Sequence, residues 1–340
     1  MGDLLMSVPA VRALKQSFSA KITVLTSSMA APVTPFISEI DEVIAFDLPW
    51  VQAREATEGS LVLKLAEQLK ERKFDAAVIF TVFSQSAMPA AMIAYLADIP
   101  LRLAYSRENP YNLLTSWFAD KEPYTFIQHQ VERDLKLVRS VGAETNDFRL
   151  SLNISAKART NAQKKISDAG VDVEKPWLIF HAAVSEKKRE YPAELWTEAA
   201  KKLIVERDFQ ILFTGTVSDR LLCEQLAKAA GCNAVSAAGL FSIEEFIAVI
   251  AQSRVVVSVN TGTVHIAAAV NTPVVVLYAQ TNPQHTPWMV SNKVLEFEVD
   301  EKYRSKNEVI QSLYNGIYQS AAPLPTATDI FNAVNSLLSK

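Results

Sequence analysis

The chain has 340 residues, of which 49% are hydrophobic and 21% charged, and its formal net charge is −3. This length suits two domains of similar size better than one. The weakly acidic balance excludes the basic excess of nucleic-acid-binding proteins, so we expect no nucleic-acid partner. No run reaches the ~18 apolar residues of a transmembrane helix, and no basic leader precedes an apolar run. We therefore expect a cytoplasmic protein with no transmembrane segment.

Short apolar segments rich in β-branched residues alternate with segments of helical periodicity. The strand-like segments are Ile22–Leu25, Ala76–Phe80, Trp177–Phe180, Gln210–Phe213, Val255–Val259 and Pro273–Tyr278. The helical ones are Asp3–Gln16, Leu61–Arg72, Ala87–Leu96, Glu132–Arg139, Ala156–Ala169, Ala193–Val205, Asp219–Ala230, Ile243–Ala251 and Ala327–Leu338. This alternation predicts an α/β fold whose parallel sheets are covered by helices on both faces.

The pattern fades in an irregular stretch, Tyr105–Phe126, and resumes after Phe148–Ser155. We therefore place one Rossmann-like domain at residues 1–150 and a second at 151–325. The last segment, 326–340, contains a helix that we expect to pack back on the first domain, on topology alone. The first helix starts at residue 3, although a doubly wound domain normally opens with a strand. Either the chain lacks this strand or the natural start lies upstream.

The strongest constellation for chemistry is the turn after the strand Val255–Val259. Its residues Asn260, Thr261, Gly262 and Thr263 lead into a helix of small residues that contains His265. A helix N-terminus carries unpaired N–H groups and partial positive charge, so it attracts phosphate. His265 could reach a phosphate oxygen or have a structural role. A plain capped helix would give the same turn, and this alternative stays open.

Three weaker signals fall where the same chemistry could use them. Thr214 and Gly215 follow another strand of the second domain, although an ordinary turn explains them equally well. Lys188 and Arg189 could neutralise a diphosphate, or form a solvated charge run before a helix. Asp3 could cap the first helix or act as a general base in an interdomain cleft.

Cofactor signals are absent from the sequence. The four histidines, His129, His181, His265 and His285, lie far apart and match no metal-binding spacing. A nicotinamide-dependent dehydrogenase needs a Gly-x-Gly-x-x-Gly loop after its first strand, and this chain of nine glycines has none. We therefore expect neither a metal ion nor an organic cofactor.

Taken in order, these motifs resemble glycosyltransferase family 9, the bacterial heptosyltransferase family. The resemblance runs nearly end to end and is strongest in two segments. It is carried by Gly2-Asp3-Leu4-Leu5, Phe74–Ile79, Ile99–Tyr105, Ala238–Glu245, Asn260–Ala269, Thr272–Val276 and Ala279–Pro283. Three motifs depart from the family pattern: Asn260 replaces the usual Asp, Arg189 the Lys of a Lys-x-Trp-Pro motif, and Ala279-Gln280 a Gly-Pro pair.

The resemblance implies a GT-B fold, with the acceptor on the first domain and the nucleotide sugar on the second. It implies inverting transfer without an essential metal, usually of heptose from ADP-heptose to the inner core of lipopolysaccharide, a glycolipid acceptor at the inner face of the membrane. We assign Asp3 as the base, and Arg189, with Lys188, and the N–H groups of Thr261–Thr263 to the diphosphate. The alternatives are a family-9-like transferase for another nucleotide sugar and an inactive protein that binds one.

Overall fold

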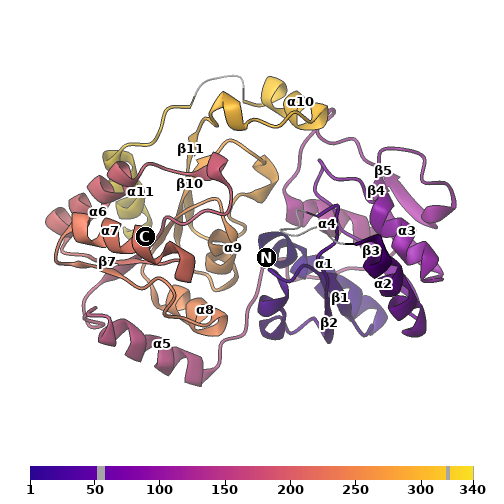
Figure 1. Ribbon diagram of the computed structural model, residues 1–340, viewed down its shortest axis with the longest axis horizontal. Helices are drawn as coiled ribbons and strands as arrows, with labels where there is room; N and C mark the ends of the chain where they lie inside the picture. Colours follow the sequence, from indigo (N-terminus) through magenta and orange to yellow (C-terminus); the bar gives the residue numbers. More distant parts are fainter. Residues whose placement is uncertain (52–57, 319–321, 340) are drawn as a thin grey trace.

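The computed structural model describes residues 1–51, 58–318 and 322–339, which form two lobes side by side (Figure 1). We call residues 1–150 the first half and the rest the second half. The first half contains α1 (Gly2–Phe18), β1 (Thr23–Thr26), β2 (Glu42–Ala45), α2 (Gly59–Glu71), β3 (Ala76–Ile79), α3 (Met88–Leu96), β4 (Leu101–Ser106), β5 (Ser116–Ala119) and α4 (Gln130–Arg139). The second half begins with α5 (Ala156–Asp168), β6 (Trp177–His181), α6 (Ala193–Arg207), β7 (Gln210–Phe213), α7 (Arg220–Ala230) and β8 (Ala234–Ser236). It continues with α8 (Ile243–Gln252), β9 (Val256–Val259), α9 (Gly262–Ala269), β10 (Val274–Ala279), β11 (Asn292–Phe297), α10 (Glu308–Gly316) and α11 (Ala327–Leu338).

The six predicted strands and the nine predicted helices are all present, with ends displaced by at most two residues. All strand pairs in the described residues are parallel, which confirms the α/β fold class. Among these residues no strand precedes α1, which begins at Gly2. The domain boundary near residue 150 stays a prediction.

The second half is built on one six-stranded sheet in the order β11-β10-β9-β6-β7-β8. Neighbouring residues of its strands alternate between two cores. Ile179 and Val256 join the core under α5, α8 and α9, whereas Leu178 and Val257 join the core under α6, α7 and α11. Burial on both faces explains why these strands are continuous apolar runs, and hence why they were predictable from sequence.

The first half divides its strands between two sheets, β1-β2 and β3-β4-β5. One helical layer joins them, because Leu25 of β1, Ile44 of β2 and Ala77 of β3 all contact the apolar cluster of α2 and α3. On the other face, α1 and α4 cover Val78 and Phe80. The two sheets therefore share a single hydrophobic layer although the structure shows no ladder between them in the described residues.

The C-terminal helix overturns one expectation. α11 packs on α6 and on the strands β10 and β11 of the second half, not on the first domain. Its apolar stripe, Ile330, Ala333, Val334 and Leu337, is buried with Trp196 of α6. The six-stranded sheet leaves an apolar surface beside α6, and burial of this stripe there removes it from water without the helix crossing to the other lobe.

The stretch Tyr105–Phe126, predicted to be irregular, contains the last two residues of β4 and all of β5. Strand β4 holds a buried arginine, Arg102, whose guanidinium donates to the main-chain carbonyls of Ile99, Leu113 and Asn112. Strand β5 is exposed along its whole length. Neither strand therefore shows the apolar pattern that identifies a buried strand.

Candidate active site

The N-terminus of α9 has no side-chain cap, and Met1 lies 3.6 Å from the place that a Cβ on Gly262 would take. Strand β9 ends at Val259, and α9 begins at Gly262 with Thr261 as its N-cap. The Thr261 side chain makes no capping hydrogen bond, and its Oγ1 lies 3.3 Å from Ser258 Oγ instead. The first N–H groups of α9 thus lack the side-chain acceptor that usually satisfies them, which leaves them free for an anion.

Helix α1 meets α9 at this point, and Figure 1 shows the chain's N-terminus beside α9, between the lobes. Gly2 permits the approach, because a Cβ there would lie 2.7 Å from His265 Cδ2. Leu5 and Met6 of α1 are buried in one core with Val264 and Ile266 of α9. Packing of α1 on α9 therefore fixes Asp3 at the junction of the two halves.

Asp3 lies in an open but electrically positive place. Its side chain is 73% exposed, and its Oδ1 lies 3.8 Å from His285 Nε2. Desolvation acts to raise the pKa of Asp3, but the positive charges that His285, the chain's amino group, His265 and Arg189 can carry outweigh it and lower the pKa below its ordinary value. Asp3 is therefore an ionised carboxylate at neutral pH, able to accept a proton.

Arg189 reaches the turn before α9 from the other side. Its Nη1 donates to the main-chain carbonyl of Asn260 at 3.1 Å, and its Nη2 lies 3.6 Å from Glu186 Oε1. Its Nε is buried without a partner in the described residues. Lys188, in contrast, forms an ion pair with Glu186 at 2.7 Å. Arg189 therefore contacts the turn before α9 directly, whereas Lys188 is held by Glu186.

The side chain of Asn260 is occupied by its neighbours. Its Nδ2 donates to Thr281 Oγ1 at 3.0 Å, and its Oδ1 accepts from the main-chain N–H of Ala279 at 3.3 Å. The residue is 9% exposed. Asn260 thus ties the end of β9 to the loop after β10, and its main-chain carbonyl holds Arg189. Its role in the site is to position other groups.

His265 is buried behind this site. Burial lowers the pKa of His265 to about 3, so the imidazole is neutral at pH 7. Its Nδ1 has no partner among the described residues. A neutral imidazole can donate one hydrogen bond to an oxygen but adds no charge.

Thr214 and Gly215 lie at the same sheet edge but are not open to it. β6 is hydrogen bonded to β7 on one side and to β9 on the other, so the ends of these three strands are neighbours. Thr214 is buried, and its hydroxyl lies 3.0 Å from Nδ1 of His181, at the end of β6. A Cβ on Gly215 would lie 2.7 Å from the Cβ of Asp219. The structure gives these two residues a packing role beside the site.

Sequence reasoning used the loop after β10 only for the family resemblance and gave it no residue in the site. His285 of this loop approaches Asp3, and its Nε2 also lies 3.3 Å from Nδ2 of Asn282. Burial lowers the pKa of His285, so the ring is neutral at pH 7. The loop follows a buried strand at the carboxyl edge of the sheet, as do the turns that were selected from the sequence. This position is the signal by which His285 could have been predicted.

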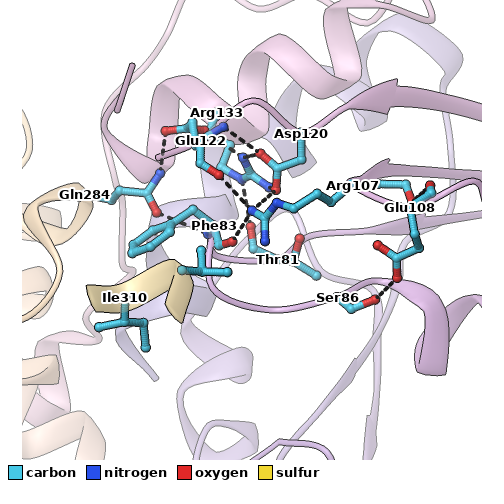
Figure 2. A network of polar contacts seen from close by, with 12 residues as sticks. Thr81, Phe83, Ser86, Arg107, Glu108, Asp120, Glu122, Arg133, Gln284 and Ile310 are labelled. Atoms are coloured by element: carbon cyan, nitrogen blue, oxygen red, sulfur yellow. Dashed lines mark hydrogen bonds and ion pairs between the residues drawn. The ribbon is translucent and has the colours of Figure 1, made fainter. Parts of the chain in front are cut away.

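Gln284, the residue before His285, crosses to the first half (Figure 2). Its Nε2 donates to Glu122 Oε1 at 2.9 Å, and its Oε1 accepts from the main-chain N–H of Phe83 at 3.4 Å. Glu122 is buried and paired with Arg133 at 2.6 Å. The loop after β10 therefore contacts Asp3 through His285 and the first half through Gln284.

Comparison with solved structures identifies the fold. A family 9 glycosyltransferase from Veillonella parvula has a TM-score of 0.80 at 18% identity, covering 100% of this chain and 94% of that one. ADP-heptose lps heptosyltransferase II of Escherichia coli has a TM-score of 0.73 at 23% identity, covering 99% and 96%. The fold is therefore of the GT-B type, two facing lobes with parallel sheets.

Comparison of sequences identifies the family. The family model described as "Glycosyltransferase family 9 (heptosyltransferase)" matches residues 62–317. Lipopolysaccharide heptosyltransferase 2 of Salmonella typhimurium is 26% identical over 100% of this chain and 96% of its own length. Its counterpart in Escherichia coli is 27% identical over 84% of this chain and 82% of its own. The chain belongs to glycosyltransferase family 9 and is a glycosyltransferase.

Two further observations concern only the residues that the structure describes. In the ranges 1–51, 58–318 and 322–339, no three residues of His, Cys, Asp or Glu are grouped so that they could hold a metal ion. No helix in this part of the chain combines the length and apolar character needed to cross a membrane.

Proposed function

We propose that this protein transfers heptose from ADP-heptose to the inner core of lipopolysaccharide or to a related glycan. Three observations on relatives support the proposal. The Salmonella typhimurium and Escherichia coli relatives are lipopolysaccharide heptosyltransferases. A structurally similar Escherichia coli heptosyltransferase, with a TM-score of 0.67, was solved with ADP. Another structure of TM-score 0.66 holds ADP-2-deoxy-2-fluoro heptose.

The observation that carries the proposal is the meeting of Asp3, Arg189 and the N-terminus of α9. Asp3 comes from the first half, and the other two come from the second half. Packing of α1 against α9 brings the carboxylate beside the helix end, and Arg189 is bonded to the residue two positions before it. A base beside an anion-binding pair is the arrangement that sugar transfer from a diphosphate requires.

In the proposed mechanism, the acceptor oxygen attacks the anomeric carbon from the face opposite the diphosphate. The bond from that carbon to the diphosphate oxygen breaks, and the acceptor proton passes to Asp3. Arg189, with Lys188 near it, and the N–H groups of Gly262 and Thr263 stabilise the charge that collects on the diphosphate, while the N–H of Thr261 donates to the Val259 carbonyl at 2.7 Å. A diphosphate is a good leaving group, so no protein acid is needed, and the configuration inverts.

The proposed acceptor also assigns a location. A lipopolysaccharide core under construction is a glycolipid at the inner face of the cytoplasmic membrane. We therefore propose a cytoplasmic protein that contacts this face from outside the bilayer. Its two partners are the nucleotide sugar and the glycolipid.

One feature favours a second candidate, a transferase for another nucleotide sugar. The family usually has aspartate at the position of Asn260, so this chain lacks a negative charge beside the donor site. Loss of that charge changes the preference for donor groups that would have bonded to it. An inactive protein that keeps the site only to bind the nucleotide sugar is the third candidate.

A donor panel separates the three. The protein is incubated with ADP-heptose and with ADP-, UDP- and GDP-hexoses, each with a heptose-deficient core oligosaccharide. Released nucleotide and the product mass are measured. We expect ADP release and a gain of one heptose only when donor and acceptor are both present. Turnover with another donor alone would establish the second candidate. A raised melting temperature with ADP and no turnover with any donor would establish the inactive binder.

A further inference from the structure

A hollow of about 280 Å3 lies at one edge of the three-stranded sheet. Gln85 and Ser86 line it just after β3, Ser106 and Arg107 at the end of β4, and Asp120 just after β5. All three strands are parallel, so the hollow sits at their carboxyl ends, where open α/β sheets bind ligands. The proposed reaction site above does not use it.

The floor of the hollow is held by buried ion pairs (Figure 2). Arg133 binds both oxygens of Asp120 at 2.9 Å and one of Glu122 at 2.6 Å. Arg107 donates through Nη2 to the main-chain carbonyls of Phe83 and Glu122, both at 2.7 Å. These contacts fix the walls before any ligand arrives, which lowers the entropic cost of binding.

The charge of this network argues against an anionic ligand. Two guanidinium groups, of Arg107 and Arg133, contact the carboxylates of Asp120 and Glu122, and Glu108 also lines the hollow. Three carboxylates against two guanidinium groups leave one net negative charge. A phosphate or carboxylate in the hollow would be repelled by this negative charge. The Arg133 guanidinium could not offset the repulsion, because Asp120 already accepts its hydrogen bonds.

The groups that remain suit hydroxyl groups. The Ser86 hydroxyl donates to Glu108 Oε1 at 2.6 Å, and its oxygen accepts from the main-chain N–H of Met88 at 3.2 Å, so one lone pair remains to accept from a ligand. That hydrogen bond lowers the pKa of Glu108, so the carboxylate is ionised and its second oxygen can accept strongly from a hydroxyl. The structure gives the amide of Gln85 no side-chain partner in its described residues, and it supplies donors and an acceptor. Tyr105 adds a partly apolar wall.

We propose that this hollow binds one uncharged sugar ring of the acceptor glycan, held by Gln85, Ser86 and Glu108. The inference rests on the proposed glycosyl transfer and names a subsite for its acceptor. The volume is just below the ~300 Å3 at which small-molecule sites begin, so it fits a single ring. Hydroxyl groups on opposite sides of a ring can then bond to the carboxylate and to the amide together.

The hollow connects to Asp3 through one short segment. The main-chain carbonyl of Phe83 accepts from Arg107 on the hollow side, and its N–H donates to Gln284 on the other. Gln284 precedes His285, which lies 3.8 Å from Asp3. The backbone of Phe83 therefore links Arg107, which lines the hollow, to the loop beside Asp3.

Two readouts on the same variants test the proposal. The first is NMR saturation transfer from the protein, with the proposed donor site filled by ADP, to methyl α-mannoside, methyl α-glucoside and, as the anionic probe, methyl phosphate. The second is KM for the core oligosaccharide and for the donor. The variants are Glu108→Gln, which removes the charged acceptor, and Gln85→Trp, which fills the hollow from an exposed position. Glu71→Gln, exposed at the end of α2, is the matched control.

We expect a glycoside signal that both variants weaken and the control keeps, with no methyl phosphate signal. Each variant should raise the acceptor KM about tenfold or more while the donor KM and the melting temperature stay unchanged. Unchanged glycoside binding and unchanged acceptor KM in both variants would overturn the subsite, as would phosphate binding at the hollow. Glycoside binding lost in the variants without transfer by the wild type would refute the proposed function but support the subsite.

Discussion

The two halves differ in how completely their sheets are enclosed. Each residue of β7, β9 and β10 in the second half is buried, whereas β5 of the first half is exposed throughout and β1 is only half-buried. The enclosed sheet places the elements that we propose to bind phosphate on a rigid edge. The open sheet leaves its carboxyl edge hollow and polar. The enclosed sheet of the second half suits a compact diphosphate, and the more exposed sheet of the first half suits a large glycan.

Charge follows the same division. The turn before α9 offers N–H groups and Arg189 to an anion, while the hollow of the first half carries one excess negative charge. Asp3 stands between them, on a helix of the first half that packs against the second. The contrast therefore assigns one binding partner to each side and the proton transfer to the junction.

The largest effect is expected where the halves meet. Asp3→Asn keeps the size of the side chain and removes its basicity, so we expect kcat to fall about a thousandfold, within the usual contribution of a general base. Rates are measured with matched donor and acceptor. Asp168→Asn, exposed on α5, is the control and should leave kcat unchanged. A near-normal rate for Asp3→Asn in a folded protein would remove Asp3 from the mechanism.

The contrast in enclosure is tested by a matched pair of core truncations. Leu277 in β10 is fully buried, whereas Leu25 in β1 is half-buried. We expect Leu277→Ala to lower the free energy of unfolding by about 3 kcal/mol. Leu25→Ala should lower it by only about 1 kcal/mol, because the half-buried Leu25 side chain buries less apolar surface in the folded protein. Urea unfolding of both variants measures the two losses. Equal losses would show that the first half is as tightly enclosed as the second.

Arg189 tests the anionic side of the comparison. Arg189→Ala should weaken ADP binding about tenfold to a hundredfold, because it removes a charge-assisted hydrogen-bond donor. Arg189→Lys should retain part of this affinity, since the positive charge stays. Calorimetric titration with ADP measures both, and Arg159→Ala on α5 serves as the exposed control. An unchanged ADP dissociation constant in Arg189→Ala would exclude its phosphate role.

The smallest effect concerns a buried acid beneath Asp3. Asp134 accepts from Ser7 Oγ at 2.7 Å and from Gln130 Nε2 at 2.8 Å. Burial, together with the charge of Asp3, raises the pKa of Asp134 to about 7. The two hydrogen bonds and the charge of Arg133 act in the opposite direction but are outweighed. The folded protein thus holds a proton that the unfolded chain releases above about pH 4, so this group lowers stability as the pH rises from about 4 to 7.

Asp134→Asn removes this penalty and keeps groups able to bond to Ser7 and Gln130. We expect the variant to melt at a higher temperature than the wild type at pH 8, and the difference to shrink at pH 5. Thermal unfolding at the two pH values measures it. A variant that is equally destabilised at both pH values would show that Asp134 is ionised in the folded protein throughout this range.

The same contrast explains what the sequence could and could not predict. Strands buried on both faces are continuous apolar runs, so the sheet of the second half was predictable except at its edges, β8 and β11. The exposed β5 and the arginine-bearing β4 lack that pattern. Asp3 and Arg189 were selected as candidate site residues because they are charged and lie next to predicted helices or strands. His285 and Gln284 were missed because their roles depend on contacts with residues more than 150 positions away.

A crystal structure of the protein with ADP tests the central claim most directly, because that claim places the diphosphate between Arg189 and α9. We expect a phosphate oxygen within hydrogen-bond distance of the main-chain N–H groups of Gly262 and Thr263 and of the Arg189 guanidinium, with Asp3 facing it. Phosphates bound elsewhere, with Arg189 and the N-terminus of α9 free of them, would contradict the account.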